Sequence, residues 1–163
     1  MGAAASCELP SQVITASARV QELQALNRAP IEGVTIQASE SDAFNWNITI
    51  DGPEGTPFVG GKFVVNLDFS QNYPHKPPKI KFLTKIYHPG VKTDTGEICT
   101  QAIEQNWVPT LNAKFVIEAI VTVVKTPNAD NAQEITIAQQ WQSNNAAWAA
   151  TAAEWVQQYA QPQ

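Results

Sequence analysis

The sequence predicts an α+β fold, in which one antiparallel sheet is followed by a loop-rich segment and then by helices. Apolar residues recur at helical spacing near the start of the chain, alternate with polar residues between positions 34 and 82, and return to helical spacing from position 115. Strands grouped together and helices grouped after them are typical of an α+β layer arrangement. The length of 163 residues suits one domain with one core.

An amphipathic helix is expected first. Pro10-Ser11 gives a start signal, Pro30 gives a stop, and apolar residues fall near helical spacing between them: Val13, Ile14, Ala16, Val20, Leu23 and Leu26. We expect residues 1–10 to be a flexible tail and residues 11–163 to form the core domain.

Four strands are expected next, at residues 34–36, 46–50, 63–69 and 80–82. Each is rich in β-branched or aromatic residues with a period of two, and Gly and Pro residues separate them. The links have hairpin length, so the sequence predicts an antiparallel meander.

Helices are expected to close the chain. Residues 115–124 are strongly apolar and end before Pro127, and residues 134–159 are rich in Ala and Gln and predict two more helices. Large aromatic groups recur in the last third and are interpreted as core or groove-filling residues: Trp141, Trp148, Trp155 and Tyr159.

The charge balance argues against a nucleic-acid binder. The chain has 10 basic and 15 acidic residues, a formal net charge of -5, whereas nucleic-acid binders usually show a basic surplus or stripe. A local basic cluster is interpreted as a solvated face or as a docking patch: Lys76, Lys79, Lys81 and Lys85. Two cysteines far apart form no disulfide framework, which indicates a reducing compartment. No apolar run approaches the about 20 residues that span a bilayer, and a monomer is expected.

The first residues fit a targeting pattern. Met1-Gly2-Ala3-Ala4-Ala5-Ser6 fits the N-myristoylation pattern, and the adjacent Cys7 offers a palmitoylation site. One myristoyl chain binds a membrane only marginally, so the second chain matters. We expect a cytoplasmic protein, with the nucleus left open, that associates with membranes if Gly2 is acylated. The alternative is a small-residue tail without modification.

Cys99 is the candidate nucleophile. It lies in a loop-rich segment between the last strand and the apolar helix, beside polar residues such as Glu97 and Thr100. A free cysteine is most often a small buried apolar residue, but this polar setting favours a reactive thiol.

Five motifs around this segment occur in the order found in the ubiquitin-conjugating (E2) enzymes, and the chain resembles that family over nearly its whole length. The motifs are Gly52–Phe63 (GPEGTPFVGGKF), Tyr73–Lys79 (YPHKPPK), His88-Pro89-Gly90, Gly96-Glu97-Ile98-Cys99 and Trp107-Val108-Pro109.

The resemblance implies the E2 (UBC) fold and a reaction. Cys99 is expected to accept ubiquitin from an E1 enzyme as a thioester and to pass it to an E3 cysteine or a substrate lysine. A thiolate is both a good nucleophile and a good leaving group, so it stores an acyl group and releases it. No metal and no cofactor are expected. In this reaction ATP is used by the E1, which agrees with the absence of a P-loop pattern from the sequence.

Three positions depart from the family pattern. Gly90 stands where the family has an Asn that supports the active-site loop and stabilises the oxyanion, and Gln101 stands where an Asp is common. Asn131, with Asp130 beside it, stands where an acidic residue or Ser guides the incoming lysine. Loss of one oxyanion donor costs on the order of 100-fold in rate. Replacements that the sequence offers are the backbone N–H of Gly90 and the side chains of Thr93, Thr95 and Asn106.

These departures suggest that the Cys99 thioester transfers ubiquitin poorly to lysine. They suggest that the chain works with E3 enzymes that have their own cysteine (HECT or RBR type), with RING partners left open. The resemblance places the E3 surface on three segments: Ala18, Arg19 and Gln21, then His75, then Val108, Pro109 and Thr110. His75 replaces a Phe that many E2 enzymes use, which counts against the HECT preference. His88 is interpreted as structural, because it lies several residues from Cys99.

Three alternatives remain. The modifier could be a ubiquitin-like protein, or Gly90 could mark a catalytically weak E2-like scaffold. An unrelated thiol enzyme would need a His partner, but both histidines, His75 and His88, belong to the E2 motifs.

Overall fold

A computed structural model describes residues 11–38, 44–69, 73, 75–98, 101–128, 130 and 132–161, with the side chains of 11–17 and 101–102 also left out. The predicted tail over residues 1–10, including Gly2 and Cys7, lies outside the described residues, so acylation and the boundary after residue 10 stay predictions. None of the helices within the described ranges is long and apolar enough to cross a membrane.

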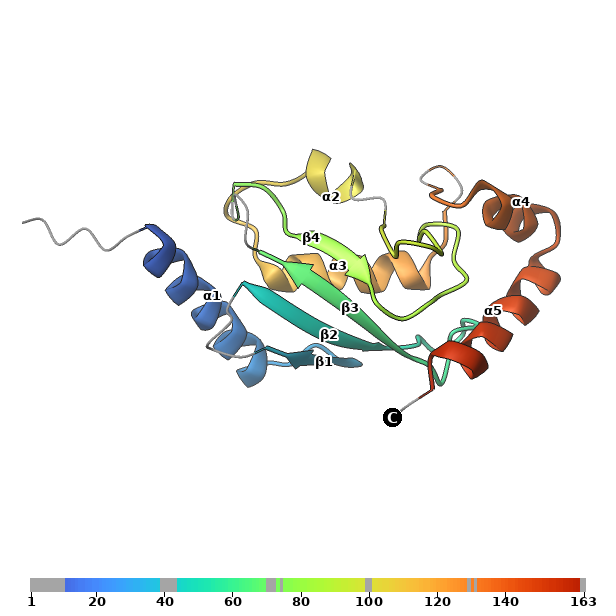
Figure 1. Ribbon diagram of the computed structural model, residues 1–163, viewed down its shortest axis with the longest axis horizontal. Helices are drawn as coiled ribbons and strands as arrows, with labels where there is room; N and C mark the ends of the chain where they lie inside the picture. Colours follow the sequence, from blue (N-terminus) through green and yellow to red (C-terminus); the bar gives the residue numbers. More distant parts are fainter. Residues whose placement is uncertain are drawn as a thin grey trace, which may run out of the picture.

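The sheet is the predicted antiparallel meander (Figure 1). Its strands are β1 (Val34–Gln37), β2 (Asn45–Asp51), β3 (Lys62–Asp68) and β4 (Lys79–Phe82), and they lie side by side in the order β1-β2-β3-β4. Ile48 of β2 is opposite Val65 of β3, and Val65 is opposite Phe82 of β4. Short links between neighbouring strands make this the simplest topology for the pattern.

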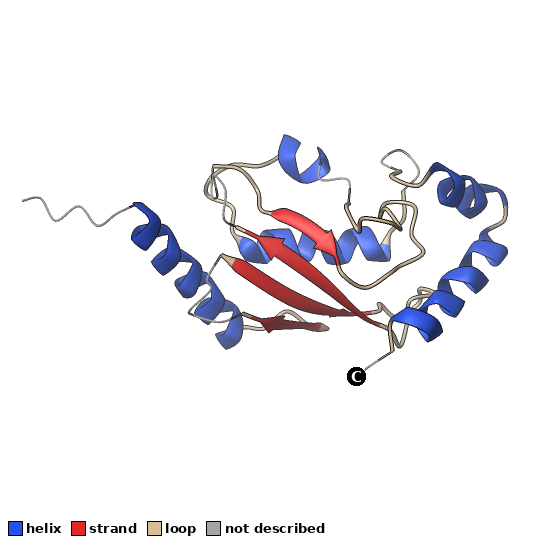
Figure 2. Cartoon of the chain, viewed as in Figure 1, coloured by secondary structure: helices blue, strands red, loops and turns tan. Residues whose placement is uncertain are grey.

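Four of the helices match the predicted ones: α1 (Ser11–Arg28), α3 (Ala113–Lys125), α4 (Ile135–Ser143) and α5 (Asn145–Tyr159). The short helix α2 (Gln101–Gln105) lies in the segment that the sequence predicted as loop. Five residues are too few to show a helical period, so this correction concerns an element that periodicity cannot detect. Figure 2 shows α3 lying along the sheet, with α1 at one end and α4 and α5 at the other.

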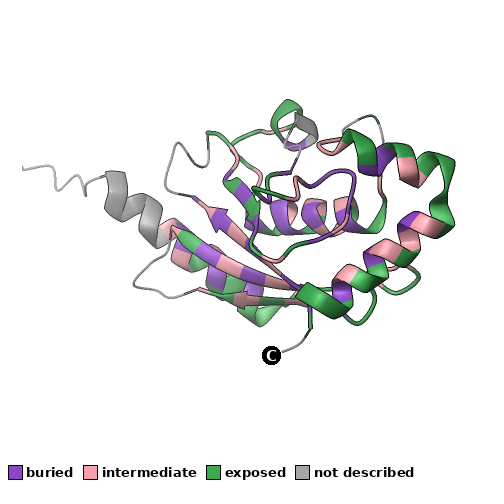
Figure 3. Ribbon diagram, turned by 45° about the vertical axis from the view of Figure 1, so that its right-hand side comes forward, coloured by how far each residue is buried: buried purple, intermediate pink, exposed green. Residues whose placement is uncertain are grey.

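The core lies between the sheet and α3 (Figure 3). Residues alternate between buried and less buried along β2, β3 and β4. Trp46, Ile48 and Val65 are fully buried in one cluster with Val116 and Ile120 of α3. Asn112 caps the start of α3, because its side chain accepts a hydrogen bond from the backbone N–H of Phe115 at 3.1 Å. This layer is the rigid support for the segment that follows β4.

The inner face of α1 contains a buried cation that the apolar pattern did not predict. Arg19 is 3% exposed, its guanidinium carbon lies 3.7 Å from the ring centroid of Tyr73, and its Nη1 lies 3.1 Å from Glu22. The hydroxyl of Tyr73 lies 3.2 Å from both carboxylate oxygens of Glu22. Burial, together with the Glu22 charge, raises the pKa of Tyr73. These three side chains fix α1 to the turn that precedes β4.

Candidate functional site

His88 lies in the loop after β4 and anchors this loop to α3. Its side chain is 1% exposed, Nε2 lies 2.9 Å from the backbone oxygen of Val123, and Nδ1 accepts the backbone N–H of Gly90 at 2.9 Å. Because Nδ1 accepts, the neutral ring carries its proton on Nε2 and donates it to Val123. Burial lowers the pKa of His88 to about 4 against the opposing effect of the backbone bonds to α3. The ring is therefore a neutral structural link, in agreement with the prediction.

Gly90 is buried against this ring. A β-carbon at position 90 would lie 3.2 Å from Nδ1 and 3.3 Å from Cε1 of His88, and 3.8 Å from Cγ1 of Val123. Its N–H is bound to His88, so it is not available as the backbone oxyanion donor that the sequence had offered. This corrects one of the proposed replacements for the missing Asn side chain.

Residues 91–98 form a closed hairpin, called here the 91–98 hairpin. Val91 pairs with Ile98, and the N–H groups of Lys92 and Gly96 donate to Glu97 and Lys92 at 2.9 Å each. The far side of the hairpin pairs with β4: the N–H of Phe82 donates to Gly96 at 2.8 Å, and Lys81 pairs with Glu97. Ile98 is the residue before Cys99. Cys99 itself lies outside the described residues, as does the side chain of Gln101.

The start of α4 is fastened to this region. The N–H groups of Gln133 and Glu134 donate to the carbonyl of Pro89 at 2.8 and 3.1 Å. Oε1 of Glu134 accepts from the N–H of Thr93 at 2.9 Å and from its hydroxyl at 3.1 Å. Segments 88–98 and 133–134, which are far apart in the sequence, therefore lie together. Asp130 is exposed just before them, and its N–H donates to the side chain of Asn128 at 2.9 Å; the predicted neighbour Asn131 lies outside the described residues.

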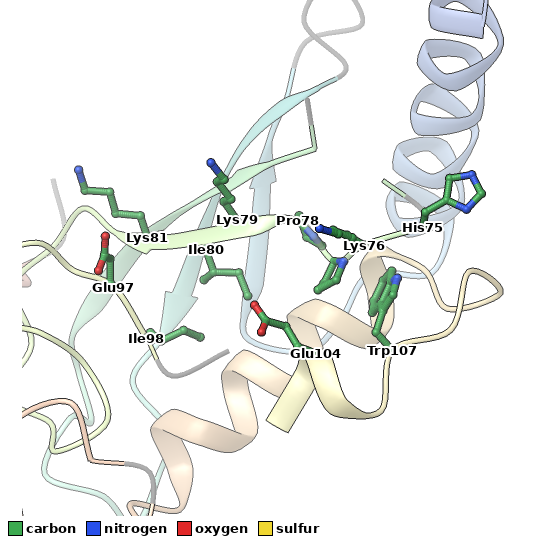
Figure 4. Close-up of a pocket in the computed structure, with 11 residues that line it drawn as sticks. His75, Lys76, Pro78, Lys79, Ile80, Lys81, Glu97, Ile98, Glu104 and Trp107 are labelled. Atoms are coloured by element: carbon green, nitrogen blue, oxygen red, sulfur yellow. The ribbon is translucent and has the colours of Figure 1, made fainter. Parts of the chain in front are cut away.

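A groove of about 730 Å³ runs along β4 and ends at Ile98 (Figure 4). Ile80 points from β4 to the side where Ile98, Glu104 and Trp107 lie, whereas Lys79 and Lys81 point to the opposite side of β4. Lys79 and Lys81 are exposed and join none of the ion pairs found among the described residues. Their exposure makes this part of the basic cluster a solvated face, and its use as a docking patch stays a prediction. The described residues contain no group of three His, Cys, Asp or Glu side chains placed to hold a metal ion.

Comparison with protein families decides the class. The family model described as ubiquitin-conjugating enzyme matches residues 18–156. The chain belongs to the ubiquitin-conjugating enzyme family. Ubiquitin conjugating enzyme E2 B of Dictyostelium discoideum is 37% identical over 140 residues, covering 86% of this chain and 94% of that protein. Ubiquitin-conjugating enzyme E2 N of Macaca fascicularis is 36% identical over 141 residues, covering 86% and 92%.

The fold agrees with the family. A solved E2 domain of a ubiquitin conjugating enzyme from Toxoplasma gondii has a TM-score of 0.81 and 30% identity, and the match covers 89% of this chain and 98% of that chain. The predicted UBC fold is confirmed, and the chain is an E2 transferase by family.

The described structure places most of the expected E3 surface on exposed positions. Ala18 is half-buried, and the others are exposed: Gln21, His75, Val108, Pro109 and Thr110. Arg19 is the exception, because its guanidinium is enclosed between Tyr73 and Glu22. Direct contact between Arg19 and a partner would require it to leave this site, so its role in this structure is to support the surface. The partner role of the other residues stays a prediction.

Sequence reasoning missed Glu134, whose carboxylate fastens the 91–98 hairpin through Thr93. Glu134 was treated only as the start of a helix, and its bond to Thr93 joins positions 41 residues apart. A carboxylate just before an apolar helix usually signals a helix start, but Glu134 makes no capping bond to α4. The helix does begin directly after Glu134, so this signal was correct for the backbone but gave no sign of the side-chain bond to Thr93.

Proposed function

We propose that this E2 accepts ubiquitin from an E1 as a thioester on Cys99 and then transfers it to a second acceptor. The Cys99 thiolate attacks the carbonyl carbon of the E1-bound thioester, the E1 cysteine leaves as a thiolate, and a new carbon–sulfur bond forms at Cys99. The observation that carries the proposal is the hairpin-and-β4 frame of residues 80–98, which ends at Ile98 directly before Cys99 in the family's GxIC motif.

We further propose that the preferred acceptor is a thiol rather than a lysine. Position 90 supplies no side chain, and its N–H is bound to His88. Both donors of Thr93 are bound to Glu134, which removes a second replacement for the missing Asn. Lysine attack needs help in losing a proton and in stabilising the oxyanion, whereas transfer between thiolates needs less. E3 enzymes with their own cysteine fit this chemistry.

A discharge experiment tests this preference. The Cys99 thioester is formed with E1, ATP and ubiquitin, further charging is stopped, and its decay is followed with free lysine or free cysteine added. We expect fast decay with cysteine and slow decay with lysine. Asn131→Asp, which restores a carboxylate, should raise the lysine rate and leave the cysteine rate unchanged. Equal decay with lysine and cysteine in the parent protein would contradict the preference.

The same assay separates the remaining alternatives. Charging with a ubiquitin-like modifier and its own E1, but not with ubiquitin, would assign the chain to that modifier. Failure with every modifier would indicate a scaffold that keeps the cysteine without the chemistry. Adding HECT, RBR or RING ligase domains to the charged E2 then shows which partner class the surface around His75 and Val108 serves.

A further inference from the structure

We propose that Glu134 is a positioning residue for thioester transfer, which holds the 91–98 hairpin through Thr93 and provides the loop support that Gly90 lacks. The inference rests on the proposed function, because the reaction it affects is the chemistry at Cys99. It concerns Glu134, which no motif of the family brought to attention, and Thr93, which the sequence offered only as a replacement donor for the missing Asn.

The contact itself is well formed. One carboxylate oxygen of Glu134 accepts two hydrogen bonds from the same residue, the N–H of Thr93 at 2.9 Å and its hydroxyl at 3.1 Å. Hydrogen bonds to an ionised carboxylate are shorter and stronger than neutral ones. Both side chains are partly buried, so solvent screens the contact less than it would at an exposed site. Because Glu134 makes no capping bond to α4, this side chain is committed to Thr93.

The hairpin transmits the position of Thr93 to the end of the segment. Thr93 follows Lys92, whose N–H and carbonyl bond Glu97 and Gly96 across the hairpin. Val91 pairs with Ile98 one step further along. A shift of Thr93 therefore moves the strand that ends at Ile98, and Cys99 is covalently attached to Ile98. Small displacements of a reacting group are costly in rate.

The need for this contact comes from position 90. Between segments 88–98 and 133–134, the described fastening consists of two main-chain bonds to the carbonyl of Pro89 and the two bonds to the Glu134 carboxylate. No side chain extends from Gly90 to add to them. Half of these bonds therefore depend on one carboxylate. The Lys92–Glu97 pair does not replace it, because it lies within the hairpin and is 3.7 Å long and exposed.

The test uses variants of both partners. Glu134→Ala removes the acceptor, Thr93→Val removes the hydroxyl but keeps the N–H, and Thr93→Ser keeps both donors. Glu154→Ala, an exposed change on α5, is the matched control. We expect Glu134→Ala to slow single-turnover discharge onto cysteine about 10-fold and Thr93→Val about 3-fold. Thr93→Ser and Glu154→Ala should keep the parent rate.

Two further readouts distinguish positioning from general damage. The KM for the E1–ubiquitin conjugate in charging should stay within about 2-fold of the parent while the discharge rate falls. In the Glu134→Ala background, Thr93→Val should have no additional effect, because the two residues act as one pair. Additive losses, or a raised KM with an unchanged discharge rate, would overturn the proposal.

Amide hydrogen exchange gives an answer that does not depend on activity. The N–H groups of Lys92, Thr93 and Gly96 should exchange at least about 10-fold faster in Glu134→Ala than in Glu154→Ala. Unchanged exchange would overturn the positioning role even if the parent charges normally. If the parent forms no thioester, the proposed function fails, and exchange at these amides still decides whether Glu134 holds the hairpin.

Discussion

The imidazole Nδ1 of His88 accepts the backbone N–H of Gly90 at 2.9 Å, while Nε2 of the same ring lies 2.9 Å from the carbonyl oxygen of Val123. One neutral ring therefore links the turn at residues 88–90, just before the 91–98 hairpin, to the end of α3. The link requires the ring to accept on Nδ1, so protonation of the ring would break the bond to Gly90.

The first prediction is a loss of stability at acid pH. The pKa of His88 is about 4 in the folded state against an ordinary 6.5, so the unfolded state binds more protons between these values. The stabilisation is complete above pH 6.5 and is lost as the pH falls to 4, with an upper value of about 3 kcal/mol. Urea unfolding at a series of pH values measures the slope.

The matched variant is His88→Gln, which keeps one donor and one acceptor but does not titrate. Carboxylates contribute to the slope in both proteins, so the difference between the two curves isolates His88. The variant should be less stable at pH 7, and the gap should narrow toward pH 4. Parallel curves would show that His88 is not the titrating group.

The second prediction concerns Gly96. Its φ is +76°, and a β-carbon there would lie 2.0 Å from the carbonyl oxygen of Phe82. Gly96→Ala therefore combines backbone strain with a collision against β4, and we expect a loss of more than about 2 kcal/mol together with impaired charging.

Gly60 provides the control for this substitution. Its φ is +83°, but a β-carbon there would meet nothing within 4 Å. Gly60→Ala should cost about 1 kcal/mol from strain alone and leave charging unchanged. The difference between the two variants, measured by urea unfolding, gives the cost of the collision with Phe82. Equal losses would contradict the close approach at Gly96.

The third prediction tests Arg19 as an internal support. Arg19→Ala removes the cation from the Tyr73 ring and leaves Glu22 without its ion pair. We expect a loss of about 1–3 kcal/mol, reduced from a fully buried pair because the Glu22 side chain is 22% exposed. Arg19→Lys keeps the charge but loses the planar contact with Tyr73 and should recover only part of the stability. Full stability in Arg19→Ala, measured by thermal unfolding, would show that the residue is free to serve a partner instead.

Local pattern was sufficient to predict the sheet, because a period of two with Gly and Pro between strands specifies each hairpin by itself. It was also sufficient for α3, whose apolar residues repeat over three turns. It failed where the decisive partner was remote. Arg19 is buried because Tyr73 and Glu22 enclose it, and Glu134, correctly placed at a helix start, also bonds Thr93, which is 41 residues away. The bond from Gly90 to His88 is local in the sequence. It forms because burial keeps the His88 ring neutral, so that Nδ1 can accept the N–H of Gly90, and sequence spacing does not report burial.

The role of Cys99 as the ubiquitin acceptor is tested most directly by charging the full chain with E1, ATP and ubiquitin and resolving the products on gels with and without reducing agent. We expect an adduct that reducing agent removes and that Cys99→Ala abolishes, whereas Cys7→Ser, at the only other cysteine, keeps it. Cys99→Ser should form an adduct that survives reducing agent, because an oxygen ester replaces the thioester. An adduct that persists in Cys99→Ala, or the absence of any adduct with ubiquitin, would contradict the central claim.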